Sequence, residues 1–343
     1  MGWFDVIRDI EALDELPLDR SLVEAFEAEA RVRPLPPLRL FTPTFRAYAT
    51  DELKGCGRNS FPAFSITGGA CALNCDHCQA KILDPMIPAT RPEELDRKVR
   101  DLVLLQNLKG FLLSGGSNRR NEVPYDRFYP TIAALKRDFP YLRIAVHTAL
   151  LDERRARRME EAGIDIAMTD VIGSQETIRD VYHLDRPVAD FERTLAALSA
   201  TTMEIVPHIV IGLHYGRLLG EERALELVAR YPVSALVLVI VMPFYAPPDR
   251  PFALIPPEAA AKVFLAAKRR IPDLPVQLGC ARPAGSHKLA TDAYAVMAGL
   301  NGIAYPAEGV VALARAIGRP VAQEHACCSL AGDGVAGAAP CAL

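Results

Sequence analysis

Three cysteines at short spacing are the residues of this 343-residue chain best suited to chemistry. They are Cys71, Cys75 and Cys78, in the segment Cys-Ala-Leu-Asn-Cys-Asp-His-Cys, and they follow an apolar, strand-like stretch at residues 61–68. Thiolates at such spacings hold iron–sulfur clusters, because the ligand loop must wrap a compact cube. Three thiolates fill three corners of a four-iron cluster, so the fourth iron stays open to a small molecule that can bind and react.

A structural zinc site is the alternative use of these thiols. Zinc usually takes four ligands, often from two knuckles of similar spacing. No second CxxC follows here, so His77 or a remote cysteine would have to complete the site. Disulfides are not expected, because the first residues run directly into charged ones instead of a secretory segment, and cysteine pairing is uncommon in cytosolic enzymes.

The C-x3-C-x2-C order resembles the signature of the radical S-adenosylmethionine (SAM) enzymes. The resemblance implies a [4Fe-4S] cluster on Cys71, Cys75 and Cys78 whose open iron chelates SAM. One electron then cleaves SAM to a 5′-deoxyadenosyl radical, which abstracts hydrogen from the substrate. It also implies that His77 stands where the family has an aromatic residue packed on adenine. In such enzymes the cofactor carries the hard chemistry, and the protein supplies position and shielding.

Composition excludes several other classes. The net charge of −3 argues against a dedicated nucleic-acid binder. The longest apolar run, residues 233–242, is short of the ~18 residues that a membrane span needs. Half of the residues are hydrophobic, which is enough for a large core. We therefore expect a cytoplasmic protein with neither a nucleic acid nor a membrane as partner.

The elements that must position the cysteines alternate regularly along the chain. Strands are predicted at residues 61–68, 109–114, 143–148, 164–170, 203–212, 236–243, 275–280 and 302–305. Helices are predicted at residues 92–107, 125–138, 151–162, 187–199, 220–230, 257–270, 287–298 and 308–316. Eight successive βα units predict an α/β fold, a (βα)8 TIM-type barrel, with a partial (βα)6 barrel as the alternative.

The sequence divides into three predicted segments. Residues 1–60 form an N-terminal helical and hairpin extension, with an acidic helical pattern, a Pro-rich link and a short strand or hairpin at 38–48. Residues 61–318 form the barrel. Residues 319–343 form a cysteine-bearing C-terminal segment whose Gly/Ala-rich end is expected to be mobile.

In barrels of this kind, active residues come from the carboxyl ends of the strands and the loops after them. The second strand leads into Gly115-Gly116-Ser117, and adjacent glycines let a ligand approach the backbone closely. The family resemblance implies that this glycine pair contacts the amino group of SAM. Ser117 stands where the family usually has an acidic residue.

Further candidates end the fourth and fifth strands. The resemblance implies that Asp170 accepts hydrogen bonds from the ribose hydroxyls of SAM. A helix-capping role is an equal alternative. Ser174 precedes Gln-Glu-Thr and is expected to cap a helix. Gly212 lies in a segment that resembles the family's glycine motif near adenine. His208 and His214 alternate with apolar residues, so they could point inward. We expect buried, hydrogen-bonded core histidines, with a functional role as the less favoured alternative.

Four other cysteines are candidates for a second, auxiliary iron–sulfur cluster. Cys280 ends the seventh strand, Cys56 is flanked by glycines, and Cys327-Cys328 follow the last helix. Any one of them alone is more often a small buried hydrophobe, and one of the adjacent pair is expected to be a bystander. Cys341 in the tail is expected to be incidental.

Five segments narrow the resemblance to a subgroup. Residues 61–68, 71–78, 208–216 and 278–283 and the pair Cys327-Cys328 are similar to the archaeal-type, two-component lipoyl synthases, which are related to biotin synthase. The resemblance runs from about residue 40 to residue 330.

This resemblance implies a sulfurtransferase that inserts sulfur from the auxiliary cluster into a protein-bound octanoyl chain. The implied partners are an octanoylated lipoyl-domain or H-protein-like carrier, a homologous partner subunit, and an electron donor such as ferredoxin or flavodoxin. Arg282 would stabilise the second cluster, bind a substrate anion, or form a salt bridge at the surface or at the barrel mouth. The alternatives are a biotin-synthase-like or other radical SAM enzyme without sulfur transfer, and a non-catalytic metal-binding barrel.

Overall fold

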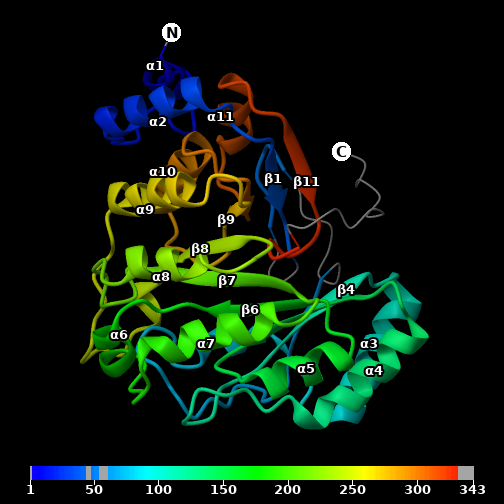
Figure 1. Ribbon diagram of the computed structural model, residues 1–343. Coiled ribbons are helices and arrows are strands. Elements are labelled where there is room, and N and C mark those ends of the chain that lie inside the picture. The colour runs from blue at the N-terminus through cyan, green and yellow to red at the C-terminus, as the bar shows by residue number, and fades with distance from the viewer. Residues whose placement is uncertain (1, 44–47, 54–60, 331–343) are drawn as a thin grey trace.

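A single parallel sheet of eleven strands forms the centre of the computed structural model, which describes residues 2–43, 48–53 and 61–330 (Figure 1). The strands lie in the order β11-β1-β10-β9-β8-β7-β6-β5-β4-β2-β3. Every ladder between neighbours is parallel. The strands are β1 (Leu38–Phe41), β2 (Ala63–Ser65), β3 (Ile87–Pro88), β4 (Gly110–Ser114), β5 (Arg143–Thr148), β6 (Ile166–Asp170), β7 (Glu204–Ile211), β8 (Leu236–Ile240), β9 (Val276–Leu278), β10 (Gly302–Ala304) and β11 (Val321–Glu324).

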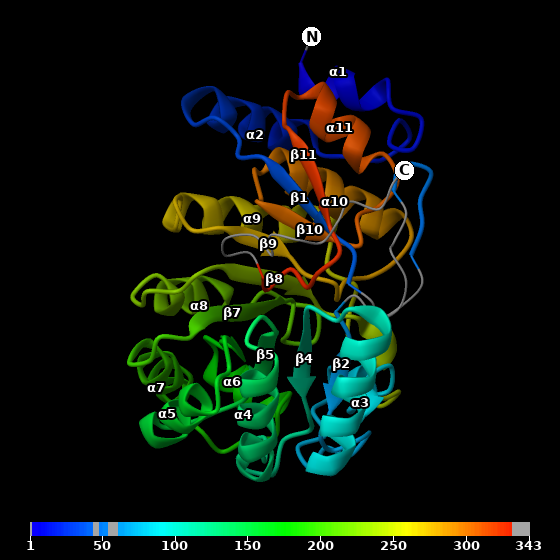
Figure 2. The same ribbon diagram turned by 90° about the vertical axis from the view of Figure 1, so that its right-hand side faces the viewer.

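The structure confirms the α/β barrel class and all eight barrel strands. These strands are β2 and β4 to β10, and a helix follows each of them in the chain. The sheet curves but does not close, since no ladder joins β3 to β11 among the described residues (Figure 2). The fold therefore has the eight units of the first prediction and the openness of the partial-barrel alternative.

The helices lie close to their predicted ranges. The structure has α1 (Trp3–Arg8), α2 (Arg20–Val32), α3 (Pro92–Gln106), α4 (Tyr129–Asp138), α5 (Glu153–Glu161), α6 (Gln175–Asp180), α7 (Val188–Ser199), α8 (Glu221–Val228), α9 (Pro257–Arg270), α10 (Ser286–Met297) and α11 (Val310–Ala316), with short 3-10 turns η1 (Lys81–Leu83), η2 (Asp126–Phe128) and η3 (Pro243–Tyr245). Helix α9 begins at its predicted proline, because a proline in the first turn lacks only an N–H that would be unpaired there. Helix α6 has only six residues, too few for an apolar periodicity, and the sequence indicated only its cap at Ser174.

The two ends of the described chain meet in the sheet. Strand β1, which falls within the strand or hairpin predicted at 38–48, lies between β10 and β11. Arg39 of β1 and Glu324 of β11 form an ion pair, with Nη2 2.7 Å from Oε2. Helix α2 covers this end of the molecule: the rings of Phe26 and Tyr294 are 6.1 Å apart. The first segment is thus packed onto the barrel, while the division of the chain into three domains stays a prediction.

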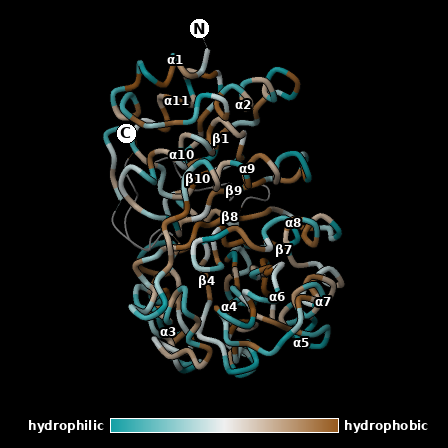
Figure 3. The backbone as a smooth tube through the Cα atoms, turned by 90° about the vertical axis from the view of Figure 1, so that its left-hand side faces the viewer, coloured by the Kyte–Doolittle hydropathy of each residue, from teal (hydrophilic) through white to brown (hydrophobic). Residues whose placement is uncertain are grey.

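The core has two layers, one on each face of the sheet. The outer face packs against the helices. The inner face is lined by small and branched side chains, which are Ala63, Leu112, Ala145, Ile166, Val206, Val237 and Ala304. Figure 3, in which the backbone is coloured by hydropathy, accordingly shows hydrophobic residues in the central strands and hydrophilic stretches in the helices. Among the described residues, no helix is long and apolar enough to cross a membrane.

Candidate active site at the carboxyl rim of the sheet

Parallel pairing places the carboxyl ends of all strands along one edge of the sheet, called the rim here. The cysteine loop (residues 71–78) follows β2, and the glycine pair follows β4, the neighbour of β2. Asp170 ends β6, Gly212 follows β7 and Cys280 follows β9. The predicted site residues within the described ranges therefore lie on the rim. Cys56 and Cys341 lie outside those ranges.

The cysteine loop packs directly against the glycine pair. The Ala72 N–H donates to the carbonyl oxygen of Ser117 over 2.9 Å, and the Gly116 N–H donates to Thr67 Oγ1 over 2.7 Å. A Cβ on Gly116 would lie 2.0 Å from the Ala70 carbonyl oxygen and 2.6 Å from the Cα of Cys71. Only glycine fits there, so the pair has at least a structural role in seating the loop. Its contact with SAM stays a prediction.

The three thiols lie in an apolar setting and near one another. Cys75 is buried, and Cys71 and Cys78 are half-buried. Burial raises the pKa of the Cys75 thiol well above its ordinary value, and the neighbouring Cys78 and Cys71 add to the effect. Burial likewise raises the pKa of Cys78 to about 11. The thiolates of Cys75 and Cys78 are thus costly without a positive partner, and a cluster of iron ions would supply one.

The donor set of this loop, three thiols within eight residues, suits an iron–sulfur cluster. Zinc draws its thiolates to about 2.3 Å from one point, whereas a cube takes one thiolate at each corner. The spacing of the three thiols along the loop and their shared burial suit the cube.

His77 lies within the same loop and stacks on Tyr182, with ring centroids 5.0 Å apart and 25° between the planes. Burial lowers the pKa of His77 to about 4, so the ring is neutral near pH 7. Its Nδ1 is buried and has no hydrogen-bond partner among the described residues. The imidazole thus has an aromatic neighbour and an open polar atom. Its stacking on adenine stays a prediction.

Two histidines and Asp170 share the inner face of the sheet near the rim. His147 of β5 and His208 of β7 have ring centroids 5.3 Å apart, and His147 Nε2 is 3.7 Å from Asp170 Oδ1. His208 Nδ1 lies 3.1 Å from the carbonyl oxygen of Val206, so it donates there and leaves Nε2 as an acceptor. Burial lowers the pKa of His208 to about 4. Sequence reasoning missed His147, although alternation along β5 could have found it.

The other predicted polar residues have mainly structural partners. Ser174 caps α6, as predicted, and accepts a hydrogen bond from the Thr177 N–H over 3.2 Å. His214 is buried, as expected, with Nδ1 3.2 Å from Thr177 Oγ1. Gly212 has a φ of +76° and donates its N–H to Glu221 Oε1 over 2.8 Å. Glu221 was not predicted, and it fixes the turn after β7.

The structure brings three of the four remaining candidate cysteines together. Cys327 and Cys328 are buried after β11, and Cys280 is exposed after β9. The hydrogen bond from Cys328 lowers the pKa of Cys327 to about 7, and Ser329 Oγ donates to the same sulfur over 3.0 Å. The pKa of Cys328 is raised, first by its bond to Cys327 and by burial, and the charge of Cys280 also contributes. Three free thiols therefore lie in one part of the rim.

Of the roles expected for Arg282, the structure shows a salt bridge. Its side chain is 1 % exposed and pairs with Asp292 through Nε–Oδ1 at 2.7 Å and Nη2–Oδ2 at 2.9 Å. It also donates to the carbonyl oxygens of Gly279 over 2.6 Å and Tyr305 over 3.0 Å. With every nitrogen engaged inside the protein, Arg282 holds the backbone beside Cys280 in place.

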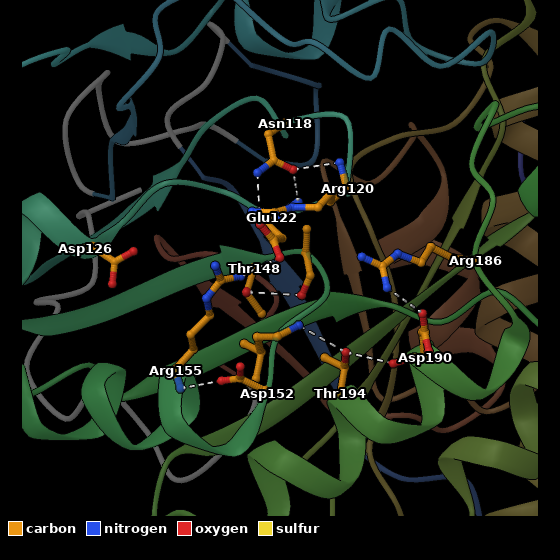
Figure 4. Close-up of polar contacts among 12 residues, drawn as sticks. Asn118, Arg120, Glu122, Asp126, Thr148, Asp152, Arg155, Arg186, Asp190 and Thr194 are labelled. Carbon is orange, nitrogen blue, oxygen red and sulfur yellow. Dashed lines mark hydrogen bonds and ion pairs between the residues drawn. The ribbon is translucent and has the colours of Figure 1, made fainter.

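A polar network holds the loops after β4 and β5 (Figure 4). Asn118 Nδ2 donates to Glu122 over 2.9 Å, and Arg155 Nη1 pairs with Glu122 Oε1 at 3.0 Å. Asp152 caps α5 by accepting the Arg155 N–H over 2.9 Å. Because this loop begins directly after Ser117, the network fixes the chain that leaves the glycine pair.

Comparisons with known proteins agree with this geometry. Residues 65–230 match the family model of the radical SAM superfamily. No curated protein matches the chain. The maturase HydG of the [FeFe]-hydrogenase from Carboxydothermus hydrogenoformans has a similar structure, with 16% identity and a TM-score of 0.57 over 88% of this chain and 71% of that one. Methylornithine synthase (PylB) has 12% identity and a TM-score of 0.53 over 94% and 97%.

At these identities the solved structures show a common fold only. Neither of the two is a lipoyl synthase, so the predicted subgroup stays a prediction. The family match is more specific, since it spans both the cysteine loop and the glycine pair. Residues 65–230 thus carry a radical SAM superfamily domain.

Proposed function

We propose that this protein is a radical SAM sulfurtransferase of the lipoyl synthase type, which inserts sulfur into a protein-bound octanoyl chain. When bound, a [4Fe-4S] cluster with SAM supplies the 5′-deoxyadenosyl radical, and an auxiliary cluster supplies sulfur. Cys71, Cys75 and Cys78 would hold the first cluster. Cys280 with Cys327 or Cys328 would hold the second, with Cys56 as a further candidate ligand.

The observation that carries the proposal is the second set of thiols on the rim. Cys280, Cys327 and Cys328 come from segments far from the cysteine loop in sequence, yet they lie at the same edge of the sheet. The apolar inner face between the two sets suits a hydrocarbon chain and keeps water from a radical.

The chain's own residues would then bind, orient and shield. The glycine pair seats the cysteine loop, and Arg282 fixes the backbone next to Cys280. An octanoylated lipoyl-domain or H-protein-like carrier, a homologous subunit and a ferredoxin or flavodoxin donor are the partners that this function requires.

One observation favours a second candidate, a biotin-synthase-like or other radical SAM enzyme without sulfur transfer. His147, Asp170 and His208 present polar atoms on the inner face. A saturated acyl chain makes no hydrogen bonds to such groups, whereas a substrate with N–H or O–H donors would.

Anaerobic turnover tests the proposal. The reconstituted protein is given SAM, dithionite and an octanoylated lipoyl-domain peptide, and mass spectrometry follows the peptide. A gain of one sulfur supports the proposal, and 5′-deoxyadenosine without sulfur gain supports the second candidate. No 5′-deoxyadenosine from a protein with its full iron content would leave only a non-catalytic metal-binding barrel.

Two cysteine variants sharpen the result. Cys280→Ala should abolish sulfur gain and leave SAM cleavage intact, and the tail variant Cys341→Ala serves as the matched control. Iron analysis should give about eight irons per chain for two cubane clusters and about four for one. A Cys280→Ala protein that still inserts sulfur would remove Cys280 from the site.

A further inference from the structure

The cysteine loop contains a buried carboxylate, Asp76, that the proposed chemistry does not use. Asp76 lies directly after Cys75 and is 2 % exposed. Its Oδ1 is 2.8 Å from His183 Nε2 and 2.9 Å from Arg250 Nη1. Its Oδ2 accepts a hydrogen bond from the Tyr215 hydroxyl over 3.0 Å. A carboxylate in the middle of an iron-binding loop thus has donors on both oxygens.

The three donors come from three different segments of the rim. His183 follows α6, Tyr215 follows β7, and Arg250 follows η3. The Tyr215 hydroxyl also lies 2.8 Å from the carbonyl oxygen of Asp180 at the end of α6. The Asp76 N–H donates in turn to the Val181 carbonyl oxygen over 3.0 Å. The contacts tie the cysteine loop to the loops that cover its neighbouring strands.

Backbone strain is concentrated around the same carboxylate. Eight non-glycine residues in the described part of the chain have positive φ, and five of them lie in the cysteine loop, directly after it, or at the donors to Asp76. These five are Asn74 at +46°, Gln79 at +49°, Ala80 at +59°, His183 at +53° and Tyr215 at +52°. Such conformations persist only where surrounding contacts over-determine them, and they gather at functional sites.

The charges around Asp76 are complementary. The Arg250 guanidinium lies 2.9 Å from Oδ1, and Tyr215 and His183 lie at hydrogen-bond distance from the same carboxylate. A surface pocket of about 260 Å³ borders the carboxylate on its outer side. The Arg250 side chain, 47 % exposed, forms part of the pocket wall. The network is therefore buried at its centre and open to solvent at its cationic side.

We propose that Asp76 is a positioning residue that locks the cysteine loop in the conformation required for cluster binding. Arg250, Tyr215 and His183 hold its carboxylate, and the strained turns on either side are kept in place by these bonds. The inference rests on the proposed function in one respect, namely that Cys71, Cys75 and Cys78 hold the cluster.

The test compares variants that differ in one contact each. Asp76→Asn removes the charge at constant size, Arg250→Met removes an exposed donor, and Arg250→Lys restores the cation. Asp249→Asn is the matched control, because this neighbouring carboxylate is 75 % exposed and 3.9 Å from Arg250. Each protein is reconstituted anaerobically, and the rate of iron loss to ferrozine is measured together with the electron paramagnetic resonance spectrum with and without SAM.

We expect Asp76→Asn and Arg250→Met to lose iron about tenfold faster than the wild type, as the loss of a hydrogen bond to a charged group implies. Arg250→Lys should restore part of the difference, and Asp249→Asn should match the wild type. The spectra of the first two variants should also respond less to SAM. Equal rates and spectra in all variants would overturn the proposal.

A measurement on the iron-free protein separates this inference from the proposed function. Hydrogen exchange at the amides of residues 72–80 should be faster in Asp76→Asn and Arg250→Met and unchanged in Asp249→Asn. That outcome supports the lock even if the wild type binds no iron, in which case only the proposed function fails. Unchanged exchange in all variants would refute the lock, whatever the iron content.

Discussion

Removing the Asp292 carboxylate should lower the free energy of unfolding more than removing a carboxylate from an exposed ion pair. Arg282 and Asp292 are 1 % and 0 % exposed and form a two-bond ion pair. Asp292 also accepts the Ala307 N–H over 2.8 Å. The variant Asp292→Ala therefore leaves a guanidinium buried without its counter-charge and an amide without its acceptor.

The expected cost follows from this geometry. Breaking a buried ion pair by removing one partner costs about 3–5 kcal/mol, since the remaining charge stays desolvated. Replacing both partners by apolar residues of similar volume is often close to neutral. We therefore expect Asp292→Ala to lower the free energy of unfolding by about 4 kcal/mol. The double variant Arg282→Met with Asp292→Leu should recover much of this loss.

Urea denaturation of the iron-free protein measures both values. The matched control is Asp101→Ala, whose partner Arg97 is 3.3 Å away and whose pair is more than half exposed. That change should cost less than about 1 kcal/mol. If Asp292→Ala cost no more than Asp101→Ala, or if the double variant lost as much as the single one, the reasoning about an uncompensated buried charge would be wrong.

Three further predictions follow from the geometry. Because the pKa of His208 is about 4 in the fold and about 6.5 when unfolded, the unfolded chain binds the extra proton first. The free energy of unfolding should thus be highest above pH ~6.5 and fall by up to about 3 kcal/mol as the pH is lowered to ~4. A His208→Gln protein whose free energy of unfolding fell equally steeply with pH would contradict this. Gly116→Ala should abolish iron binding because its Cβ meets backbone, whereas Gly69→Ala, whose Cβ lies 3.7 Å from the nearest atom, should bind iron normally. Ser174→Ala should lower the melting temperature through the loss of about 1 kcal/mol of capping at α6, and an unchanged melting curve would show that the cap is dispensable.

The barrel strands and long helices could be predicted because their patterns are local. Buried parallel strands are short apolar runs, and the helices between them carry an apolar face, so periodicity indicates both. The pairing of β1 with β11 could not be predicted this way. It joins Arg39 to Glu324, which are far apart in the sequence, and no local pattern in either segment indicates which strand it pairs with.

The candidate site divides along the same line. The cysteine loop and the glycine pair are sequence motifs, and the structure places them in contact. Asp76 could not be predicted, because its partners His183, Tyr215 and Arg250 lie on three later loops. His147 could have been found, since it alternates with buried residues along its strand.

The pairing of β1 with β11 also orders events during synthesis. Strand β11 is the last strand of the described chain, and the thiols of Cys327 and Cys328 follow it. Chains fold from the N-terminus as they leave the ribosome, so the cysteine loop can form long before the second thiol set arrives. A nascent chain stopped before Val321 would keep the first set, lack Cys327 and Cys328 of the second, and leave β1 as an unpaired edge that invites aggregation.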